Sequence, residues 1–158
     1  MFRELRRSGQ ALSEEECIRI LTEEPRGVLS VLGDDGYPYG MPMNHWYCPE
    51  DGKLYFHGGK SGHKLDAIRR DNRASFCVFD GGYRREGEWA LNIRSVIVFG
   101  KITLLDDSAQ ALEISRRLSR KFTSDERYIA DEILRSGKNV LCFALTPEFI
   151  SGKLVNES

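Results

Sequence analysis

The chain has 158 residues, a formal net charge of −1, and 41% hydrophobic and 30% charged residues. At this length folding removes about 68–70% of the unfolded surface from water, so one domain is stable without disulfides or a structural metal. The balanced charge argues against a dedicated nucleic-acid-binding protein, and no apolar run approaches the roughly 20 residues that span a bilayer. We expect a single domain over residues 1–158, with neither nucleic acid nor membrane as a partner.

The first half of the chain predicts a helix followed by three strands. A capping box starts at Ser13, and Pro25 ends the helix that we expect over residues 13–24. Strands follow at residues 27–32, 37–47 and 53–57. An Asp-Gly turn favours a hairpin between the first two strands. Pro38 and Pro42 place part of the second at a sheet edge or a bulge.

The second half alternates helices and strands. We expect helices at residues 63–72, 107–122 and 125–135, and strands at 74–79, 89–105 and 140–145. Ser124 is the expected cap of the last helix and Gly137 its end, and Gly100 marks a bulge or a close approach in the long strand. Residues 1–12 are interpreted as an N-terminal arm and residues 147–158 as a C-terminal tail.

Most of the predicted strand connections are hairpins, so the sheet should be largely antiparallel. The fold class that fits is mainly β, a closed or split antiparallel β-barrel with flanking helices, rather than a doubly wound sheet.

The cysteines indicate the compartment. They are widely separated and form no Cys-x-x-Cys motif; they are Cys17, Cys48, Cys77 and Cys142. Free, mostly buried thiols are therefore expected. The N-terminus lacks an apolar segment of signal-peptide length, so the expected location is the cytoplasm.

The most informative motif is His57-Gly58-Gly59-Lys60-Ser61-Gly62-His63-Lys64, which leaves a strand and enters a helix. Glycines let backbone N–H groups approach an anion, and the first turn of a helix offers unpaired N–H donors. Lys60, His63 and Lys64 lie where the helix dipole disfavours cations by roughly 0.3–1 kcal/mol each, which a bound anion would offset. The residue types leave two interpretations open: a phosphate site, or a flexible connector with surface lysines.

Other motifs are weaker. A Walker A loop is excluded because its earlier glycine would fall at Leu54. The Asn44 side chain offers a hydrogen-bond donor and an acceptor, as a flavin's pyrimidine edge requires. The residues around it are also typical of an ordinary strand with a buried face of methionine and aromatic side chains. Arg94 needs a partner in mid-strand: a ligand phosphate, a carboxylate in a subunit interface, or solvent. Three histidines without a companion carboxylate pattern predict no metal site.

Taken in order, five segments resemble one known family. They are Tyr37-Pro38-Tyr39-Gly40-Met41-Pro42-Met43-Asn44, Leu54-Tyr55-Phe56-His57-Gly58, Gly62-His63-Lys64-Leu65-Asp66-Ala67-Ile68-Arg69, Ser75-Phe76-Cys77-Val78 and Arg94-Ser95-Val96-Ile97-Val98-Phe99-Gly100. The chain resembles the pyridoxamine 5′-phosphate oxidase-related family of FMN-binding split barrels over about residues 13–153. Within that family it is similar to the nitroimidazole-resistance proteins, whose ending resembles Ile150-Ser151-Gly152-Lys153.

The resemblance implies a homodimer with two flavin sites at the subunit interface. It implies that Ser61, His63 and Lys64 hold the FMN phosphate. The ribityl chain and ring would be lined by Met41, Pro42, Met43 and Asn44, with His57 and Gly58 nearby. Arg94, Ser95 and Val96 would complete the site. The chain lacks the C-terminal Trp and Arg segment of true pyridoxamine phosphate oxidases, so vitamin B6 oxidation is not expected.

The function expected from this resemblance is an FMN-dependent oxidoreductase. NAD(P)H would supply electrons for a small acceptor such as a nitroaromatic compound, and His57 would be the catalytic proton donor near the ring. A purely structural His57 is the alternative for that residue. For the whole chain the alternatives are a non-catalytic flavin-binding module (reservoir, sensor or carrier) and a haem-binding barrel. FAD in place of FMN also stays open, and no nicotinamide fingerprint decides between an enzyme and a binder.

Overall fold

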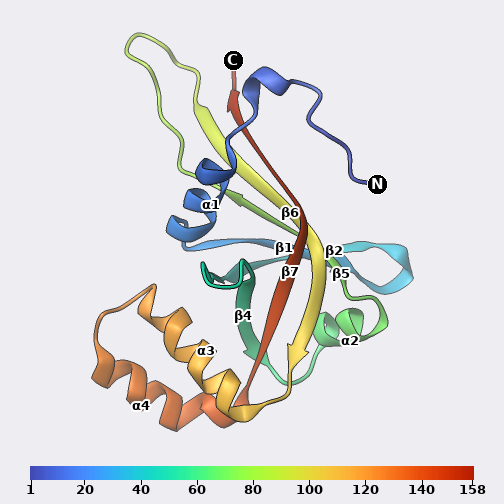
Figure 1. Cartoon of the computed structure of the whole chain (residues 1–158), viewed down its shortest axis with the longest axis vertical. Coiled ribbons are helices and arrows are strands. Elements are labelled where there is room, and N and C mark those ends of the chain that lie inside the picture. The colour runs from blue at the N-terminus through green and yellow to red at the C-terminus, as the bar shows by residue number, and fades with distance from the viewer.

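A computed structural model describes all residues from Met1 to Ser158 (Figure 1). Its helices are α1 (Glu14–Glu23), α2 (His63–Arg70), α3 (Ser108–Arg120) and α4 (Glu126–Ser136), with short 3₁₀ segments η1 (Ser8–Gln10), η2 (Asp34–Gly36) and η3 (Gly137–Asn139). Its strands are β1 (Arg26–Leu32), β2 (Pro38–Asn44), β3 (Trp46–Tyr47), β4 (Leu54–Gly59), β5 (Arg73–Phe79), β6 (Asn92–Leu105) and β7 (Val140–Asn156). No helix is long and apolar enough to cross a membrane.

The seven strands form one antiparallel sheet in the order β2-β1-β5-β6-β7-β4-β3. Strands β2 and β3 lie at opposite ends of this order, yet only His45 separates them in sequence. The sheet must therefore curl until its two ends approach each other. It does not close, because β2 pairs only with β1. The predicted split barrel with flanking helices is confirmed.

The hairpin between β1 and β2 follows from local chemistry. Asp35 and Gly36 have φ values of 55° and 77°, the left-handed conformation that an Asp-Gly pair tolerates in tight hairpins. Pro38 and Pro42 lie in β2, an edge strand, where a missing N–H costs no second ladder bond. Both predictions for this segment are confirmed.

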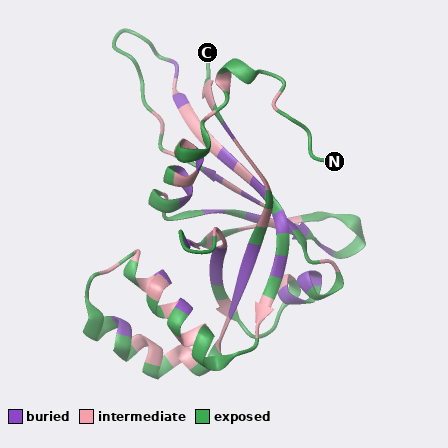
Figure 2. Ribbon diagram, viewed as in Figure 1, coloured by how far each residue is buried: buried purple, intermediate pink, exposed green.

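The barrel interior holds most of the buried side chains, which are purple in Figure 2. Phe56 packs edge-on against Phe76 at 5.0 Å and stacks on Phe143 at 5.2 Å between ring centroids. Aromatic pairs of this kind contribute about 0.5–1.5 kcal/mol each beyond the area that they bury.

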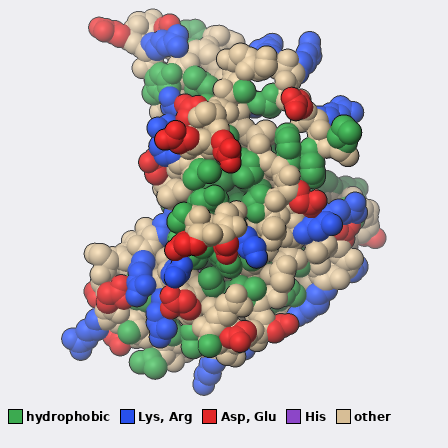
Figure 3. All heavy atoms as spheres, in the orientation of Figure 1, with side chains coloured by type: hydrophobic (Ala, Val, Ile, Leu, Met, Phe, Trp, Pro, Cys, Tyr) green, Lys and Arg blue, Asp and Glu red, His purple; other side chains and the backbone are tan.

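The space-filling view shows hydrophobic side chains across the middle of one face, with dense charge over α3 and α4 below (Figure 3).

The C-terminal segment departs from the prediction. Residues 147–156 continue β7 and pair with β6, so the expected tail from residue 147 is wrong except for the last two residues. The bulge expected at Gly100 is confirmed by a register shift at that residue, and a side chain there would collide with the Thr146 carbonyl oxygen. The order of residues 147–156 comes from their pairing with β6, which no local sequence pattern shows.

Helices α3 and α4 form a hairpin at the end of the barrel where β6 ends and β7 begins (Figure 1). The expected cap Ser124 is wrong by one residue, because the Asp125 carboxylate accepts a hydrogen bond from the Tyr128 N–H at 3.0 Å. Carboxylates are favoured at this position by the helix dipole. Gly137 does follow the last helical residue, but with φ −57° rather than a left-handed cap.

Candidate functional site

The Gly-rich turn joins β4 to α2 at the opening of the split barrel. Gly62 has a φ of 122°, which other residues rarely adopt, and no side chain caps the N-terminus of α2. Ser61 is exposed. The first N–H groups of α2 are therefore free for an outside acceptor.

Lys64 lies inside this opening. Its half-buried ammonium group is 3.6 Å from Met43 Sδ in β2 and 5.6 Å from the Phe143 ring centroid. A side chain at Gly58 in β4 would have its Cβ 2.9 Å from Lys64 Nζ, so the glycine makes room for the lysine. No carboxylate pairs with Lys64. Burial lowers its pKa, which is the expected effect on an ammonium group without a compensating anion.

His57 lies on β4, opposite Cys142 of β7. Although part of the residue is open to solvent, the surrounding protein atoms lower its pKa, and the positive charge of Lys64 lowers it further. Both effects disfavour the protonated ring. A neutral imidazole donates a hydrogen bond from one nitrogen and accepts one at the other.

His63 is turned toward the β1–β2 hairpin. Its ring stacks on Tyr39 with 4.2 Å between centroids, and its Nε2 is 3.6 Å from an Asp34 carboxylate oxygen. The same carboxylate is 2.9 Å from Arg70 Nη1. Asp34 therefore offsets positive charge at one side of α2 and leaves Lys64 without such a partner.

The stretch Met41 to Asn44 divides between the two faces of β2. Met41 and Met43 are half-buried against the core, whereas Pro42 and Asn44 are exposed on the other face. The Asn44 side-chain oxygen accepts a hydrogen bond from Arg26 Nε at 3.2 Å. Among these four predicted ligand-lining side chains, Met43 contacts Lys64 through its sulfur at 3.6 Å.

Arg94, Ser95 and Val96 lie far from the turn within one chain. Arg94 is opposite Leu154 of β7 and Gly58 is opposite Leu141. At about 3.3 Å per residue these two β7 positions are roughly 40 Å apart along the strand. The sequence-predicted residues thus form two groups rather than one site in the monomer.

The surroundings of Arg94 supply the partner that its position requires. Its Nη1 is 3.5 Å from an Asp80 carboxylate oxygen, and its guanidinium lies 5.2 Å from the Tyr83 ring centroid. Its Nε is buried without a hydrogen-bond partner. Val96 is fully buried in the core, so only its backbone can face a ligand.

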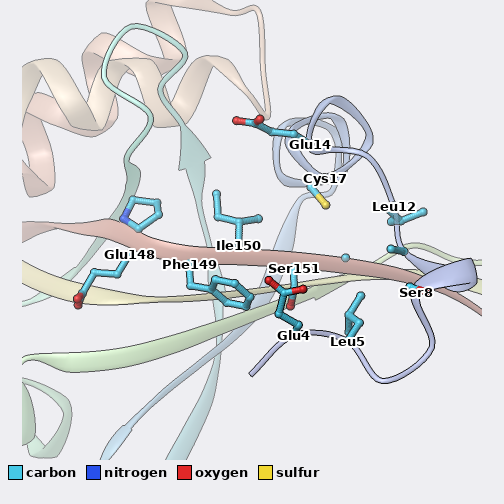
Figure 4. Close-up of a pocket in the computed structure, with 13 residues that line it drawn as sticks. Glu4, Leu5, Ser8, Leu12, Glu14, Cys17, Glu148, Phe149, Ile150 and Ser151 are labelled. Carbon is cyan, nitrogen blue, oxygen red and sulfur yellow. The ribbon is translucent and has the colours of Figure 1, made fainter. Parts of the chain in front are cut away.

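A separate cavity of about 550 Å³ lies between the N-terminal arm, α1 and β7 (Figure 4). Its charged side chains are all acidic: Glu4, Glu14 and Glu148. None of the predicted ligand residues lines it. An acidic lining disfavours a phosphate, so the barrel opening remains the better candidate.

The family model for pyridoxamine 5′-phosphate oxidase matches residues 13–154. The chain belongs to this family. The predicted resemblance is therefore confirmed over nearly the whole chain. A comparison with curated proteins finds no match.

Solved structures share the fold of this pyridoxamine 5′-phosphate oxidase family member. A candidate 5-nitroimidazole antibiotic resistance protein from Bacteroides thetaiotaomicron has a TM-score of 0.80 at 20% identity, covering 92% of this chain and 87% of that one. An FAD-binding protein from Mesorhizobium loti has a TM-score of 0.66 at 24% identity, with coverages of 92% and 97%. An FAD and heme binding protein from Mycobacterium smegmatis has a TM-score of 0.73 at 22% identity, with coverages of 94% and 74%.

Sequence reasoning missed several neighbours of the predicted residues in this family member. Asp34 lies in the turn between β1 and β2, where its sequence context gives no sign that its carboxylate contacts His63 and Arg70. Asp80 and Tyr83 surround Arg94 from the loop before β6. No spacing in the sequence indicates these contacts, because each joins segments that only the folded sheet brings together.

Proposed function

We propose that the chain binds a flavin, FMN in the first place, with its phosphate at the barrel opening. The observation that carries this proposal is Lys64: a half-buried ammonium group without a carboxylate partner, beside the uncapped N-terminus of α2. Such a group is costly unless an anion joins it. Family membership and the flavin-binding names of structural relatives support the same cofactor.

The residues present fit a flavin phosphate. Lys64 would supply a charge-assisted contact, Ser61 a hydroxyl, and the first backbone N–H groups of α2 further donors. His63 would add a donor at the rim, where Asp34 already orients it. Met43 and His57, on either side of the opening, would lie next to the rest of the cofactor.

Arg94, Ser95 and Val96 lie too far from Lys64 to join its site within one chain, but they can contribute to the flavin site if the protein is a homodimer. The outer sheet face exposes Val28, Leu32, Phe79 and Phe99, with exposed fractions of 38%, 46%, 57% and 37%. A second copy of the chain would cover this apolar face. Ser95 lies on it, opposite Phe79 and Lys153. We infer that Arg94 and Ser95 of one subunit complete the site at the opening of the other.

The proposed activity is a flavin-dependent reduction of a small acceptor, such as a nitroaromatic compound, with NAD(P)H as electron donor. The bound flavin would supply the hydride and electron chemistry. His57 would hold a proton near the acceptor, and its lowered pKa keeps one nitrogen free to accept a hydrogen bond at neutral pH.

Mass spectrometry of the ligand released from purified protein tests the cofactor directly. FMN is the expected result; haem, or no flavin after supplementation, would contradict the proposal. Rapid-mixing absorbance with NADH and NADPH then tests the activity. Flavin that bleaches and is reoxidised by a nitroimidazole supports the reductase, whereas flavin that stays oxidised with both donors favours a non-catalytic flavin carrier. Sedimentation at several protein concentrations tests the dimer.

A further inference from the structure

A cavity of about 690 Å³ lies where α3, α4 and η3 meet the start of β7 and the Gly-rich turn. Its volume falls in the range of small-molecule sites, roughly 300–1,000 Å³. Lys64 does not line it, so this cavity is distinct from the barrel opening. Lys60 of the Gly-rich turn lies at its edge.

The floor of the cavity is apolar. Its hydrophobic lining includes Leu105, Ala111, Leu112, Ile133, Val140 and Leu141. Gly137 packs closely on this lining, because a Cβ there would lie 3.0 Å from Leu112 Cδ2 and 3.4 Å from Ile133 Cγ2. Leu134, which also lines the cavity, is 83% exposed. An apolar group of a ligand would remove this surface from water.

The charge at the cavity is positive. Four cations from four segments line it: Lys60, Arg69, Arg116 and Lys138. The acidic lining residues are Asp106 and Asp107, and the latter is engaged as the α3 cap, accepting from the Gln110 N–H at 2.8 Å.

The two lysines have no carboxylate partner. The nearest carboxylate contacts of Arg69 and Arg116 are long, at 3.8 and 3.9 Å. The cation side chains are thus largely free to approach a ligand.

We propose that this cavity binds a small amphipathic organic anion. Its apolar body lies on the floor between α3 and α4, and its sulfate, phosphate or carboxylate head lies between Lys60 and Lys138. This site shares only the Gly-rich turn with the proposed flavin site, through Lys60, and it does not include Lys64. Binding of an organic anion here and binding of a flavin at the barrel opening can therefore be tested separately.

Isothermal titration calorimetry with two matched probes tests this site. Octyl sulfate and octyl glucoside share the alkyl body and differ in charge, and both are used below their micelle concentrations. We expect saturable binding of one octyl sulfate per chain, about tenfold tighter than octyl glucoside. The double variant Lys60→Ala with Lys138→Ala should weaken octyl sulfate about tenfold and leave octyl glucoside unchanged.

Two further variants separate this site from general surface charge. Arg3→Ala with Arg6→Ala removes two exposed cations from the N-terminal arm and should leave both affinities unchanged. Gly137→Leu, tolerated by the backbone at φ −57°, should fill the cavity and weaken both probes, with thermal melting as the check that it folds. Non-saturable binding, or equal losses in the lysine double variant and the arginine double variant, would overturn the proposal.

Discussion

Two half-buried lysines, Lys64 and Lys121, occupy contrasting surroundings. Lys121 lies just after α3, and its ammonium group donates to the Glu24 carbonyl at 2.5 Å and the His45 carbonyl at 2.9 Å. Burial lowers its pKa to about 8. Lys64 is also lowered by burial, but its polar contact is the Met43 thioether at 3.6 Å.

The difference separates a lysine with oxygen acceptors inside the chain from a lysine whose proposed acceptor is a ligand. Lys121 joins the end of α1, the break between β2 and β3, and the α3–α4 hairpin, so its donors are used within the chain. The ammonium group of Lys64 is also partly removed from water, but no oxygen acceptor in the chain replaces the hydrogen bonds that it loses. Burial is thus common to both residues, and the lack of an oxygen acceptor at Lys64 is the reason for choosing the barrel opening as the candidate site.

The largest expected effect concerns His45, which is fully buried beside Lys121. Burial and the Lys121 charge lower its pKa from 6.5 to about 4. The folded chain keeps the ring neutral while the unfolded chain takes up a proton, so stability present above pH 6.5 is lost as pH falls to 4. The loss is about 3 kcal/mol.

Urea unfolding across this pH range measures the effect. His45→Gln should show a correspondingly shallower pH dependence than the wild type. Identical pH dependence in the two proteins would mean that His45 is not held neutral by the Lys121 region.

A smaller loss is expected for Lys121→Met. The substitution leaves the Glu24 and His45 carbonyl oxygens without their donor, which should lower the free energy of unfolding by about 2 kcal/mol. Lys138→Met, which changes an exposed lysine, serves as the control. If the Lys121→Met protein is as stable as this control, the hydrogen bonds of Lys121 do not stabilise the fold, and Lys121 does not differ from Lys64 in this respect.

The smallest effect on stability is expected for Lys64→Met. Because no oxygen acceptor is orphaned, the cofactor-free variant should stay within about 1 kcal/mol of the wild type in the same urea experiment. A loss as large as that of Lys121→Met would assign Lys64 a structural role instead.

Local features of this fold were predictable from sequence. The capping box is present as expected, with Ser13 Oγ accepting from the Glu16 N–H at 3.2 Å. The Asp-Gly hairpin and the helix after the Gly-rich turn also follow from neighbouring residues. The extension of β7 was missed because its order comes from pairing with β6, a partner about 60 positions away in the chain, and not from its own alternation.

For the candidate site, too, local features were predictable from sequence and long-range contacts were not. The residue types of the Gly-rich turn left a phosphate site and a flexible connector open, and the position of Lys64 between β2 and β4 favours the phosphate site. That Arg94 needs a partner was also clear, but Asp80 could not be identified as that partner from spacing alone. The separation of Arg94 from Lys64 depends on strand register along β7, which no local pattern encodes.

Lys64 is the residue proposed to bind the phosphate of a flavin. Titration of cofactor-free wild type and Lys64→Met with FMN and with riboflavin, which lacks the phosphate, tests this proposal most directly. Loss of a charge-assisted contact of about 1.5–3 kcal/mol should weaken FMN roughly 10- to 150-fold and leave riboflavin within about twofold. An unchanged FMN affinity at moderate salt, or an equal loss for both ligands, would contradict the account.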